Sequence, residues 1–269
     1  MVVPRHPFFD GLRPTLHIAH RGGSLVAPEN TLVAFRRAVH EFATDMLEID
    51  VHATHDGVIV VAHDDTVDRC TNGEGPIASK TWAELEQLDA GYRFTSLGST
   101  ETPYRGLGVR VPTLASVLRE FPGLRFNIEL KGTAPGLEHL LAEVVRKAGV
   151  ARVCVGSEDD GTGRRVVEAM PECCHFYPRE ALTKVVMALK MGMAADDSEP
   201  FTVLDMPLEY GGVRLVDREL VDRAGAMGRW VNVWTIDDRD EMGRLIEAGV
   251  GGIMTDRPDL LREELTARR

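Results

Sequence analysis

Two carboxylates alternate with apolar residues in the segment MLEIDVHA (46–53). If this segment is a β-strand, Glu48 and Asp50 project from one face together with His52, and the apolar residues project from the other. We expect the apolar face to pack against helices, which would place both carboxylates inside the protein. Two like charges removed from water need a nearby cation or a raised pKa, so this pair predicts a cation site.

A third carboxylate, Glu129, stands in a second strand-like segment, RFNIEL (125–130). There it would share an inward face with Asn127 and Lys131. Three carboxylates at the carboxyl ends of strands are suitable ligands for Mg²⁺ or Ca²⁺, whereas zinc would require more histidine or cysteine. A purely structural ion-pair network with Lys131 is the alternative interpretation.

A histidine is expected to return to the same place. Only five residues separate the strand 46–51 from VIVVA (58–62), which is too few for a parallel crossover, so the two must form an antiparallel hairpin. Such a hairpin would place His63 opposite Ile49, within one residue, and therefore beside the carboxylates.

A second histidine, His20, ends the segment LHIAH (16–20) and is followed by Arg21 and two glycines. Alternation groups His20 with Leu16 and Ile18, which would turn it outward, so a turn would have to redirect it. Arg21 could bind a phosphate or carboxylate through two N–H groups, although an ordinary turn is the preferred interpretation of this motif taken alone. With both histidines beside the carboxylates, the set is suited to metal-assisted phosphoester cleavage.

Strand-like and helix-like segments alternate along all 269 residues. The strand-like segments are 16–20, 46–51, 58–62, 125–130, 152–157, 174–178, 202–206, 231–236 and 251–256. The helix-like segments are 31–41 with Asn30 as its cap, 137–148, 164–170, 181–191, 218–227, 239–248 and 259–266, with shorter helices near 82–88 and after Pro112. This alternation predicts an α/β fold, a single TIM (β/α)₈ barrel domain over 1–269, with a doubly wound sheet as the alternative. A turn-rich insertion at about 66–112 would lie over the barrel mouth.

The net charge is −11, from 31 basic and 42 acidic residues. This excess of negative charge argues against nonspecific binding to nucleic acid or to anionic membranes. No apolar run reaches the roughly 18 residues of a membrane span, and the first residues carry no signal-peptide pattern. The four cysteines lack CxxC spacing, so we expect free thiols in a cytoplasmic protein. The negative charge is compatible with a small anionic substrate, because a metal ion and a few cations can reverse the field locally.

The chain resembles the glycerophosphodiester phosphodiesterase family in a series of motifs that covers nearly its whole length. The motifs are HRGG (20–23), APENT (27–31), LEIDVHATHDGVIVVAHD (47–64), DRCTNGEG (68–75), VPTL (111–114), NIELK (127–131), VWTI (233–236) and GIMTDRPD (252–259). The family is similar in its architecture too, a TIM barrel with a small insertion after the second histidine.

The resemblance implies metal-dependent hydrolysis of glycerophosphodiesters to sn-glycerol 3-phosphate and an alcohol. One histidine would deprotonate the nucleophile, either water or the glycerol 2-hydroxyl, and the other would protonate the leaving alcohol. The roles it implies are His20 and His63 as the acid–base pair, Glu48, Asp50 and Glu129 as ligands of one Mg²⁺ or Ca²⁺ ion, Arg21 and Lys131 on the phosphate, Trp234 against the glycerol, and Glu29 orienting Arg21.

Two alternative functions remain open. A lysophospholipase D-like activity would use the methionines Met187, Met191 and Met193 as an apolar patch for an acyl chain, although packing of a helix on the barrel is the preferred explanation for them. A catalytically silent phosphate-ester binding protein is the other alternative, and the presence of both histidines argues against it. The resemblance is imperfect after Ser157, where the three acidic residues Glu158, Asp159 and Asp160 stand in place of the aromatic residue found in many relatives and could change the charge of the pocket.

Overall fold

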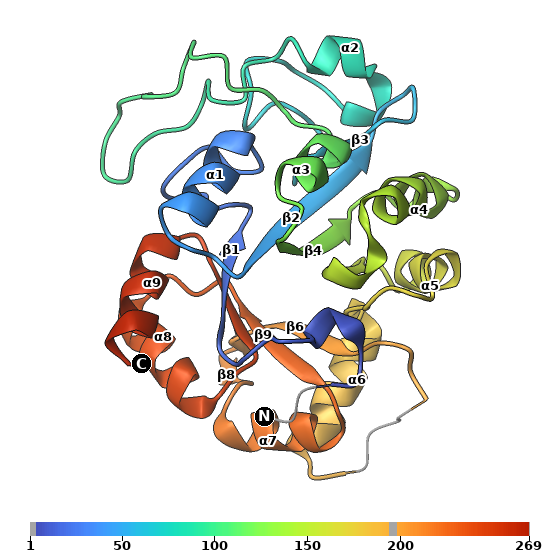
Figure 1. Ribbon diagram of the computed structural model, residues 1–269, viewed down its shortest axis with the longest axis vertical. Coiled ribbons are helices and arrows are strands. Elements are labelled where there is room, and N and C mark those ends of the chain that lie inside the picture. The colour runs from blue at the N-terminus through green and yellow to red at the C-terminus, as the bar shows by residue number, and fades with distance from the viewer. Residues whose placement is uncertain (1–3, 194–197, 269) are drawn as a thin grey trace.

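The main sheet of the protein is built from parallel strands that curl into a barrel-like layer (Figure 1). The computed structural model describes residues 4–193 and 198–268. Seven parallel strands follow the order β5-β4-β2-β1-β10-β9-β6, and β3 pairs antiparallel with β2. The strands are β1 (Leu16–His20), β2 (Met46–Ala53), β3 (Ile59–Val61), β4 (Arg125–Leu130), β5 (Val153–Gly156), β6 (Val203–Pro207), β9 (Trp230–Trp234) and β10 (Gly252–Thr255).

The segment 174–176 links the two edges of this sheet. Cys174 forms a single parallel bridge with Cys154 of β5, and Phe176 forms one with Val203 of β6. The predicted strand at 174–178 is therefore reduced to isolated bridges. The curled sheet is compatible with a TIM-like barrel and differs from the open edge that a doubly wound sheet would leave here.

Helices surround the sheet (Figure 1), and apolar side chains of the strands pack against them. They are α1 (Leu32–His40), α2 (Trp82–Leu85), α3 (Leu114–Glu120), α4 (Leu137–Ala148), α5 (Asp160–Ala169), α6 (Arg179–Lys190), α7 (Arg218–Ala226), α8 (Arg239–Ala248) and α9 (Pro258–Ala267). The predicted helices 137–148 and 239–248 are confirmed to the residue. Each has an apolar stripe in its sequence, and a glycine, Gly149 or Gly249, follows its last residue and ends it.

The predicted cap of the first helix is wrong. Thr31, not Asn30, accepts the hydrogen bond from the backbone N–H of Ala34. Asn30 has a φ of 56° and donates its side-chain amide to Asp50 at 3.1 Å. The asparagine is thus engaged in the charged cluster, and the next residue takes the capping position.

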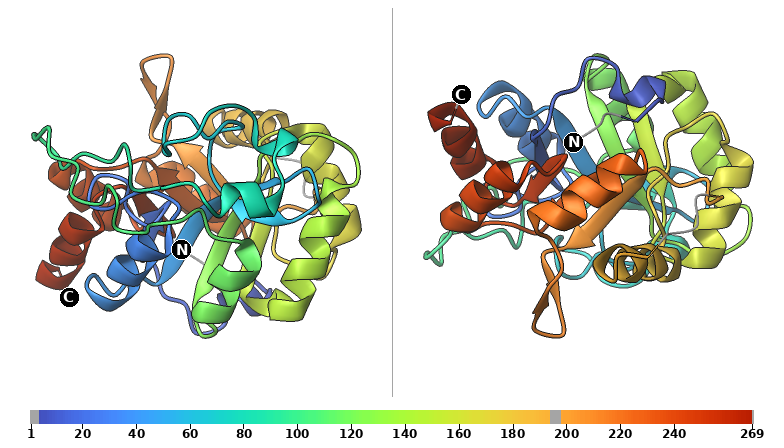
Figure 2. Two further views of the ribbon diagram at one scale, coloured as in Figure 1. Left: turned by 90° about the horizontal axis from the view of Figure 1, so that it is seen from above. Right: turned by 90° about the horizontal axis from the view of Figure 1, so that it is seen from below.

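Two segments extend the barrel. The turn-rich stretch between β3 and α3 contains α2 and packs around a small apolar cluster that includes Val67, Ile77 and Leu85. A separate hairpin of β7 (Glu209–Tyr210) and β8 (Val213–Arg214) projects from the body of the molecule (Figure 2). The sequence did not predict this hairpin, because strands of two residues show no periodicity.

All four cysteines are free, as predicted. Within the described residues, no helix is both long and apolar enough to cross a membrane.

Candidate active site

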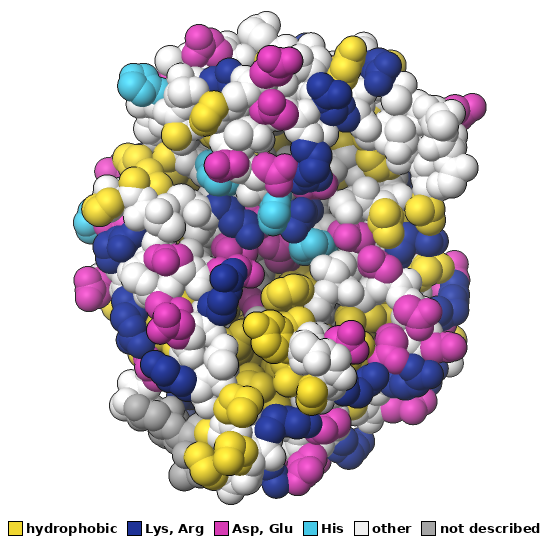
Figure 3. Space-filling view, turned by 180° about the vertical axis from the view of Figure 1, so that it is seen from behind, with side chains coloured by type: hydrophobic (Ala, Val, Ile, Leu, Met, Phe, Trp, Pro, Cys, Tyr) yellow, Lys and Arg dark blue, Asp and Glu magenta, His cyan; other side chains and the backbone are white. Residues whose placement is uncertain are grey.

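A pocket of about 620 Å³ opens at the carboxyl ends of the parallel strands. Figure 3 shows charged and histidine side chains gathered in a hollow on this face. The residues of the predicted site that line the pocket are His20, Arg21, Glu48, Asp50, His63, Glu129, Lys131 and Trp234. Glu29 lies behind them and accepts a hydrogen bond from Arg21 at 3.2 Å. The structure therefore brings together every residue that the sequence analysis assigned to the site.

Strands β2 and β4 position the three carboxylates. In the parallel register of these strands, Glu48 lies opposite Asn127 and Asp50 lies opposite Glu129. The apolar residues between them pack into the outer core against the helices. The predicted phase of both strands is confirmed, and it buries Asp50 to 1% exposure.

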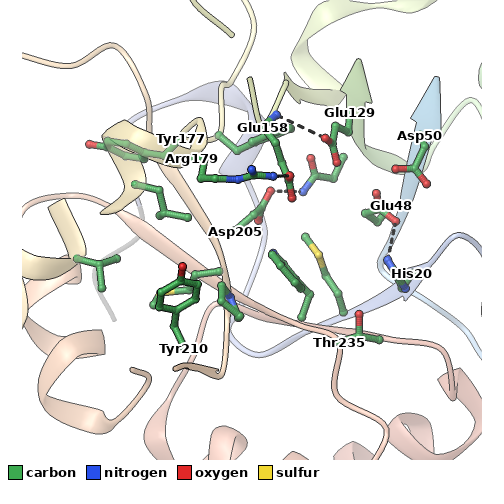
Figure 4. A pocket seen from close by; sticks show the side chains of 18 of the residues that line it. His20, Glu48, Asp50, Glu129, Glu158, Tyr177, Arg179, Asp205, Tyr210 and Thr235 are labelled. Carbon is green, nitrogen blue, oxygen red and sulfur yellow. Dashed lines mark hydrogen bonds and ion pairs between the residues drawn. The ribbon is translucent and has the colours of Figure 1, made fainter. Parts of the chain in front are cut away.

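The cations of the pocket are unevenly shared among the carboxylates. Lys131 Nζ lies 2.8 Å from Glu129 Oε2 and 3.3 Å from Asp50 Oδ1, and Arg21 Nε lies 3.3 Å from Asp50 Oδ2. The nearest charged partner of Glu48 is His20, whose Nε2 lies 3.8 Å from Glu48 Oε2 (Figure 4). Asp50 is thus held between two cations, while no lysine or arginine among residues 4–193 and 198–268 forms an ion pair with Glu48.

The pKa values show the consequence of this imbalance. Burial and the charge of Asp50 raise the pKa of Glu48 to about 8. Burial also raises the pKa of Glu129 to about 7, although the charge of Lys131 opposes this change. The negative charge of the cluster is therefore not fully compensated by the side chains around it.

The donor set fits a hard divalent cation by its chemistry. All three ligand candidates are carboxylates, which Mg²⁺ and Ca²⁺ prefer, and the raised pKa values of Glu48 and Glu129 indicate room for more positive charge. Among the described residues, no three acidic, histidine or cysteine side chains stand in the geometry of a formed metal site. Lys131 lies between Asp50 and Glu129 and pairs with both. The ion-pair network that the sequence left as an alternative is thus present, and it does not exclude a cation.

His20 faces the pocket for a different reason from the one predicted. Leu16 and Ile18 lie inside the barrel with Trp230, whereas Ala19 packs in the outer core. Alternation along β1 therefore points His20 inward without a redirecting turn. The prediction of an outward phase was wrong because it assumed that apolar strand residues face only the helices, and below the site the barrel interior is itself apolar.

The predicted hairpin delivers His63 as expected. β2 and β3 pair antiparallel with Val51 opposite Val61, and the backbone N–H of Ala62 donates to the carbonyl of Asp50. Continued by two residues, this register sets His63 opposite Ile49. The prediction is confirmed, because a loop this short permits only a hairpin.

Each histidine is held by an aspartate that the sequence analysis did not identify. His20 Nδ1 lies 2.8 Å from Asp256 Oδ1, and His63 Nδ1 lies 2.7 Å from Asp64 Oδ1. A carboxylate at Nδ1 favours a proton on that nitrogen and leaves Nε2 available for proton transfer. Burial opposes the charged form of His20, but the hydrogen bond to Asp256 and the charge of Glu48 outweigh burial and raise the pKa of His20.

Arg69 connects the two sides of the charged cluster. It donates two hydrogen bonds to Asp64, at 2.6 and 3.0 Å, and two to Glu29, at 2.7 and 2.9 Å. Because Glu29 also binds Arg21, and Arg21 reaches Asp50, a chain of ion pairs runs from His63 to the carboxylates. Arg69 lies in the predicted insertion, where no periodicity marks its direction.

The acidic segment after Ser157 reaches the rim of the pocket. The backbone N–H of Glu158 donates to Glu129 Oε1 at 3.4 Å, and the Glu158 carboxylate pairs with Arg179. Deeper in the pocket, Asp205 accepts hydrogen bonds from Asn127 at 2.6 Å and from Asn232 at 2.8 Å. Burial raises the pKa of Asp205 to about 6.

Comparisons with known proteins agree on one family. The sequence model described as "Glycerophosphoryl diester phosphodiesterase family" matches residues 20–260. A glycerophosphodiester phosphodiesterase of Caldanaerobacter subterraneus is 36% identical over 255 residues, which cover 92% of this chain and 96% of the relative.

Solved structures share the fold. A glycerophosphoryl diester phosphodiesterase domain from Mycobacterium tuberculosis superposes with a TM-score of 0.82 at 23% identity, covering 94% of this chain and 99% of the other. A phosphodiesterase from Oleispira antarctica, solved in complex with the product sn-glycerol-3-phosphate, has a TM-score of 0.72 at 25% identity, with 94% and 97% covered.

Proposed function

Because the chain belongs to the glycerophosphoryl diester phosphodiesterase family and is a phosphodiesterase, we propose that it hydrolyses glycerophosphodiesters to sn-glycerol 3-phosphate and an alcohol with the help of one divalent cation. The observation that carries this proposal is the meeting of two aspartate-held histidines with three buried carboxylates in one pocket. The product-bound structure of the similar Oleispira phosphodiesterase supports the same substrate class. The presence of both histidines in the pocket argues against a catalytically silent binding protein.

The charged wall would bind the phosphate. Arg21 and Lys131 present N–H donors to the pocket, and Glu29 fixes the guanidinium of Arg21 through its hydrogen bond. Glu48, Asp50 and Glu129 would hold Mg²⁺ or Ca²⁺. When bound, this ion would lower the pKa of the nucleophile and stabilise the charge that develops on the phosphate oxygens. Trp234, which lines the pocket at the end of β9, would lie against the glycerol.

The two histidines would transfer the protons. Nε2 of one histidine takes a proton from the nucleophile, which is water or the glycerol 2-hydroxyl, as its oxygen bonds to phosphorus. Nε2 of the other gives a proton to the leaving oxygen as the bond from phosphorus to the alcohol breaks. If the glycerol 2-hydroxyl attacks, this step gives a cyclic phosphate, and water then bonds to phosphorus and breaks its bond to the 2-oxygen, which takes up a proton to leave sn-glycerol 3-phosphate. Asp256 and Asp64 keep both rings oriented for this exchange, because each occupies the Nδ1 side.

The barrel architecture is also completed by a proposal. We propose a (β/α)₈ barrel in which the segment 174–176 takes the eighth strand position, with residues 66–112 as an insertion in a single domain. The bridges of this segment to β5 and β6 support the closure. A cytoplasmic location remains a prediction from the sequence.

A comparison of leaving groups tests the roles of the histidines. We would measure His20→Ala and His63→Ala on glycerophosphocholine, whose alkoxide leaving group needs a proton, and on glycerophospho-p-nitrophenol, whose leaving group does not. Loss of the base should lower both rates by about 10²-fold or more, and loss of the acid should lower mainly the choline rate. Near-normal turnover of glycerophosphocholine by either variant, with circular dichroism showing a folded protein, would refute that assignment.

A further inference from the structure

Large hydrophobic side chains are exposed on one side of the pocket mouth. Of the seven such side chains that are exposed among the described residues, five lie at the end of α6 or on the β7–β8 hairpin, and these five form what we call the apolar patch: Met187, Met191, Met193, Tyr210 and Val213. The three methionines are 53–65% exposed, so the preferred explanation that they pack on the barrel is wrong. The fold therefore leaves most of their surface uncovered.

The two elements that carry the apolar patch lie on the same side of the molecule. Both views of Figure 2 show α6 and the β7–β8 hairpin on one side of the sheet, with the hairpin projecting from the body. Met187 and Tyr210 also line the pocket, and Figure 3 shows hydrophobic side chains covering the surface directly beside the charged hollow. The patch therefore adjoins the pocket mouth, and an exposed apolar surface of this kind is typical of an interaction site.

The hairpin holds its apolar side chains in a fixed arrangement. Tyr210 and Val213 pair with each other across a tight turn of two glycines with positive φ, so both side chains point to the same face of the hairpin. Arg214 Nη2 donates to Glu241 Oε2 of α8 at 2.7 Å and anchors the base. The tip nevertheless leaves Tyr210 78% and Val213 60% exposed. Their exposure is thus a property of a supported element.

The charges around the apolar patch are balanced. The basic side chains of α6 and the hairpin are Arg179, Lys184, Lys190 and Arg214. Three of them are neutralised by carboxylates of neighbouring segments, in the pairs Arg179–Glu158, Lys190–Asp217 and Arg214–Glu241. The fourth, Lys184, stands one helical turn after Glu180. Within these two described elements there is therefore no excess of positive charge to attract an anionic surface.

A fluid surface of zwitterionic phospholipid matches these features. Side chains that project from a hairpin tip and a helix end can enter such a surface directly, whereas a protein interface requires a partner of complementary shape. Tyrosine is favoured where hydrocarbon meets water, and methionine adapts to irregular apolar surroundings. The net charge of −11 opposes approach to anionic lipid, and the balanced charges of the patch do not reverse this effect.

We propose that the apolar patch docks the protein reversibly on the surface of a zwitterionic phospholipid bilayer, with the pocket mouth at the edge of the contact. Tyr210, Val213 and the three methionines enter the boundary between head groups and acyl chains, while the charged wall of the pocket stays in water. The binding energy comes from burial of apolar area, so docking requires neither the cation nor the histidines. It is therefore measured independently of the proposed function.

Vesicle flotation tests the docking. The full chain is mixed with vesicles of phosphatidylcholine, and the fraction of protein that floats with the lipid gives the partition coefficient. We expect partitioning that persists in high salt, because apolar burial is not screened, and that is severalfold weaker when about a third of the lipid is phosphatidylserine. No partitioning onto phosphatidylcholine would overturn the proposal. Partitioning onto the phosphatidylserine vesicles alone would also overturn it, because charge would then govern the contact.

Matched variants locate the contact. Met191→Gln and Val213→Gln each remove an apolar side chain that does not line the pocket, so we expect each to lower the partition coefficient about tenfold without changing hydrolysis of glycerophosphocholine. Leu107→Gln removes an equally exposed leucine in the insertion and should change neither quantity. Circular dichroism shows whether each variant is folded. An unchanged partition coefficient in both patch variants would refute the assignment.

Light scattering in the absence of lipid tests whether a second copy of the chain covers the patch instead. We expect the same mass for the wild-type protein, Met191→Gln and Val213→Gln. If the wild-type protein self-associated and both variants abolished this, the patch would bind a second copy and the lipid assignment would be overturned.

Fluorescence quenching measures insertion directly. Val213→Trp places an indole at the hairpin tip, and its emission should be quenched by vesicles whose phosphatidylcholine carries brominated acyl chains. Leu107→Trp is the matched control and should show no more quenching than the wild-type protein, which contains three tryptophans of its own. Equal quenching of the two variants would contradict docking through the apolar patch, whatever diesters the protein hydrolyses.

Discussion

Replacing Arg69 by glutamine should lower catalysis although this residue does not line the pocket. Its guanidinium makes two bonds to Asp64, which orients His63, and two to Glu29, which orients Arg21. Arg69 is 48% exposed and Glu29 is 13% exposed, so each pair contributes about 0.5–1 kcal/mol rather than the larger value of a buried pair. If both contributions are lost from the transition state, kcat/KM should fall about 5- to 30-fold.

The matched control is Arg36→Gln. Arg36 is 54% exposed and makes a similar two-bonded pair with Glu120, away from the pocket. We expect kcat/KM of Arg36→Gln to stay within twofold of wild type, and the melting temperatures of both variants to change little. A double-mutant cycle of Arg69→Gln with Asp64→Asn should be less than additive, because both changes release the same histidine. Arg69→Gln with wild-type kcat/KM, or fully additive effects, would refute the reasoning.

Three further changes test other parts of the site. Glu129→Gln should raise the Mg²⁺ or Ca²⁺ concentration for half-maximal activity at least about tenfold, and an unchanged metal requirement would exclude a ligand role. Asp256→Asn should lower kcat about 10- to 100-fold without changing the circular dichroism spectrum, because His20 loses its orienting partner; retained kcat would contradict this. Folding raises the pKa of Asp205 from 3.8 to about 6. Its protonated carboxyl therefore adds about 3 kcal/mol to the free energy of unfolding below pH about 4, and this contribution is lost as the pH rises through about 6. Asp205→Asn should lack this part of the pH dependence in urea unfolding, and the same slope in both proteins would show that Asp205 is not responsible.

The carboxylates could be placed from the sequence because strands have a period of two. Once β2 was read as a strand with apolar residues toward the helices, Glu48 and Asp50 had to lie on the other face, and β4 repeats the argument for Glu129. His63 followed from loop length alone, since a short loop fixes the register of a hairpin. These predictions depend only on local geometry, and the structure confirms where they place the side chains.

Predictions failed where position depends on the whole barrel. A barrel strand has two buried faces, so alternation in β1 could not tell whether Leu16 and Ile18 faced the helices or the interior, and His20 was assigned the wrong phase. Asp256 contacts His20 from 236 residues away in the sequence. Arg69 contacts Glu29 from an irregular segment 40 residues further along the chain. Neither contact leaves a periodic signal.

The methionines around α6 illustrate the same limit. Periodicity marked the methionines around α6 as apolar, but it could not show that they would be exposed beside the pocket. The β7–β8 hairpin, whose Tyr210 also lines the pocket, has strands too short to recognise in the sequence. Local patterns therefore predicted the reacting groups, while the shape of the substrate site required the assembled fold.

Release of sn-glycerol 3-phosphate from small diesters is the decisive measurement for the proposed reaction and its cation. Glycerophosphocholine, glycerophosphoethanolamine and glycerophosphoglycerol would each be incubated with the protein in the presence of Mg²⁺, Ca²⁺ or EDTA. We predict release of sn-glycerol 3-phosphate from at least one of them with a divalent cation, and loss of this activity with EDTA. Release that is unaffected by EDTA would contradict the role of the carboxylates, and no release with either metal would contradict the proposed reaction.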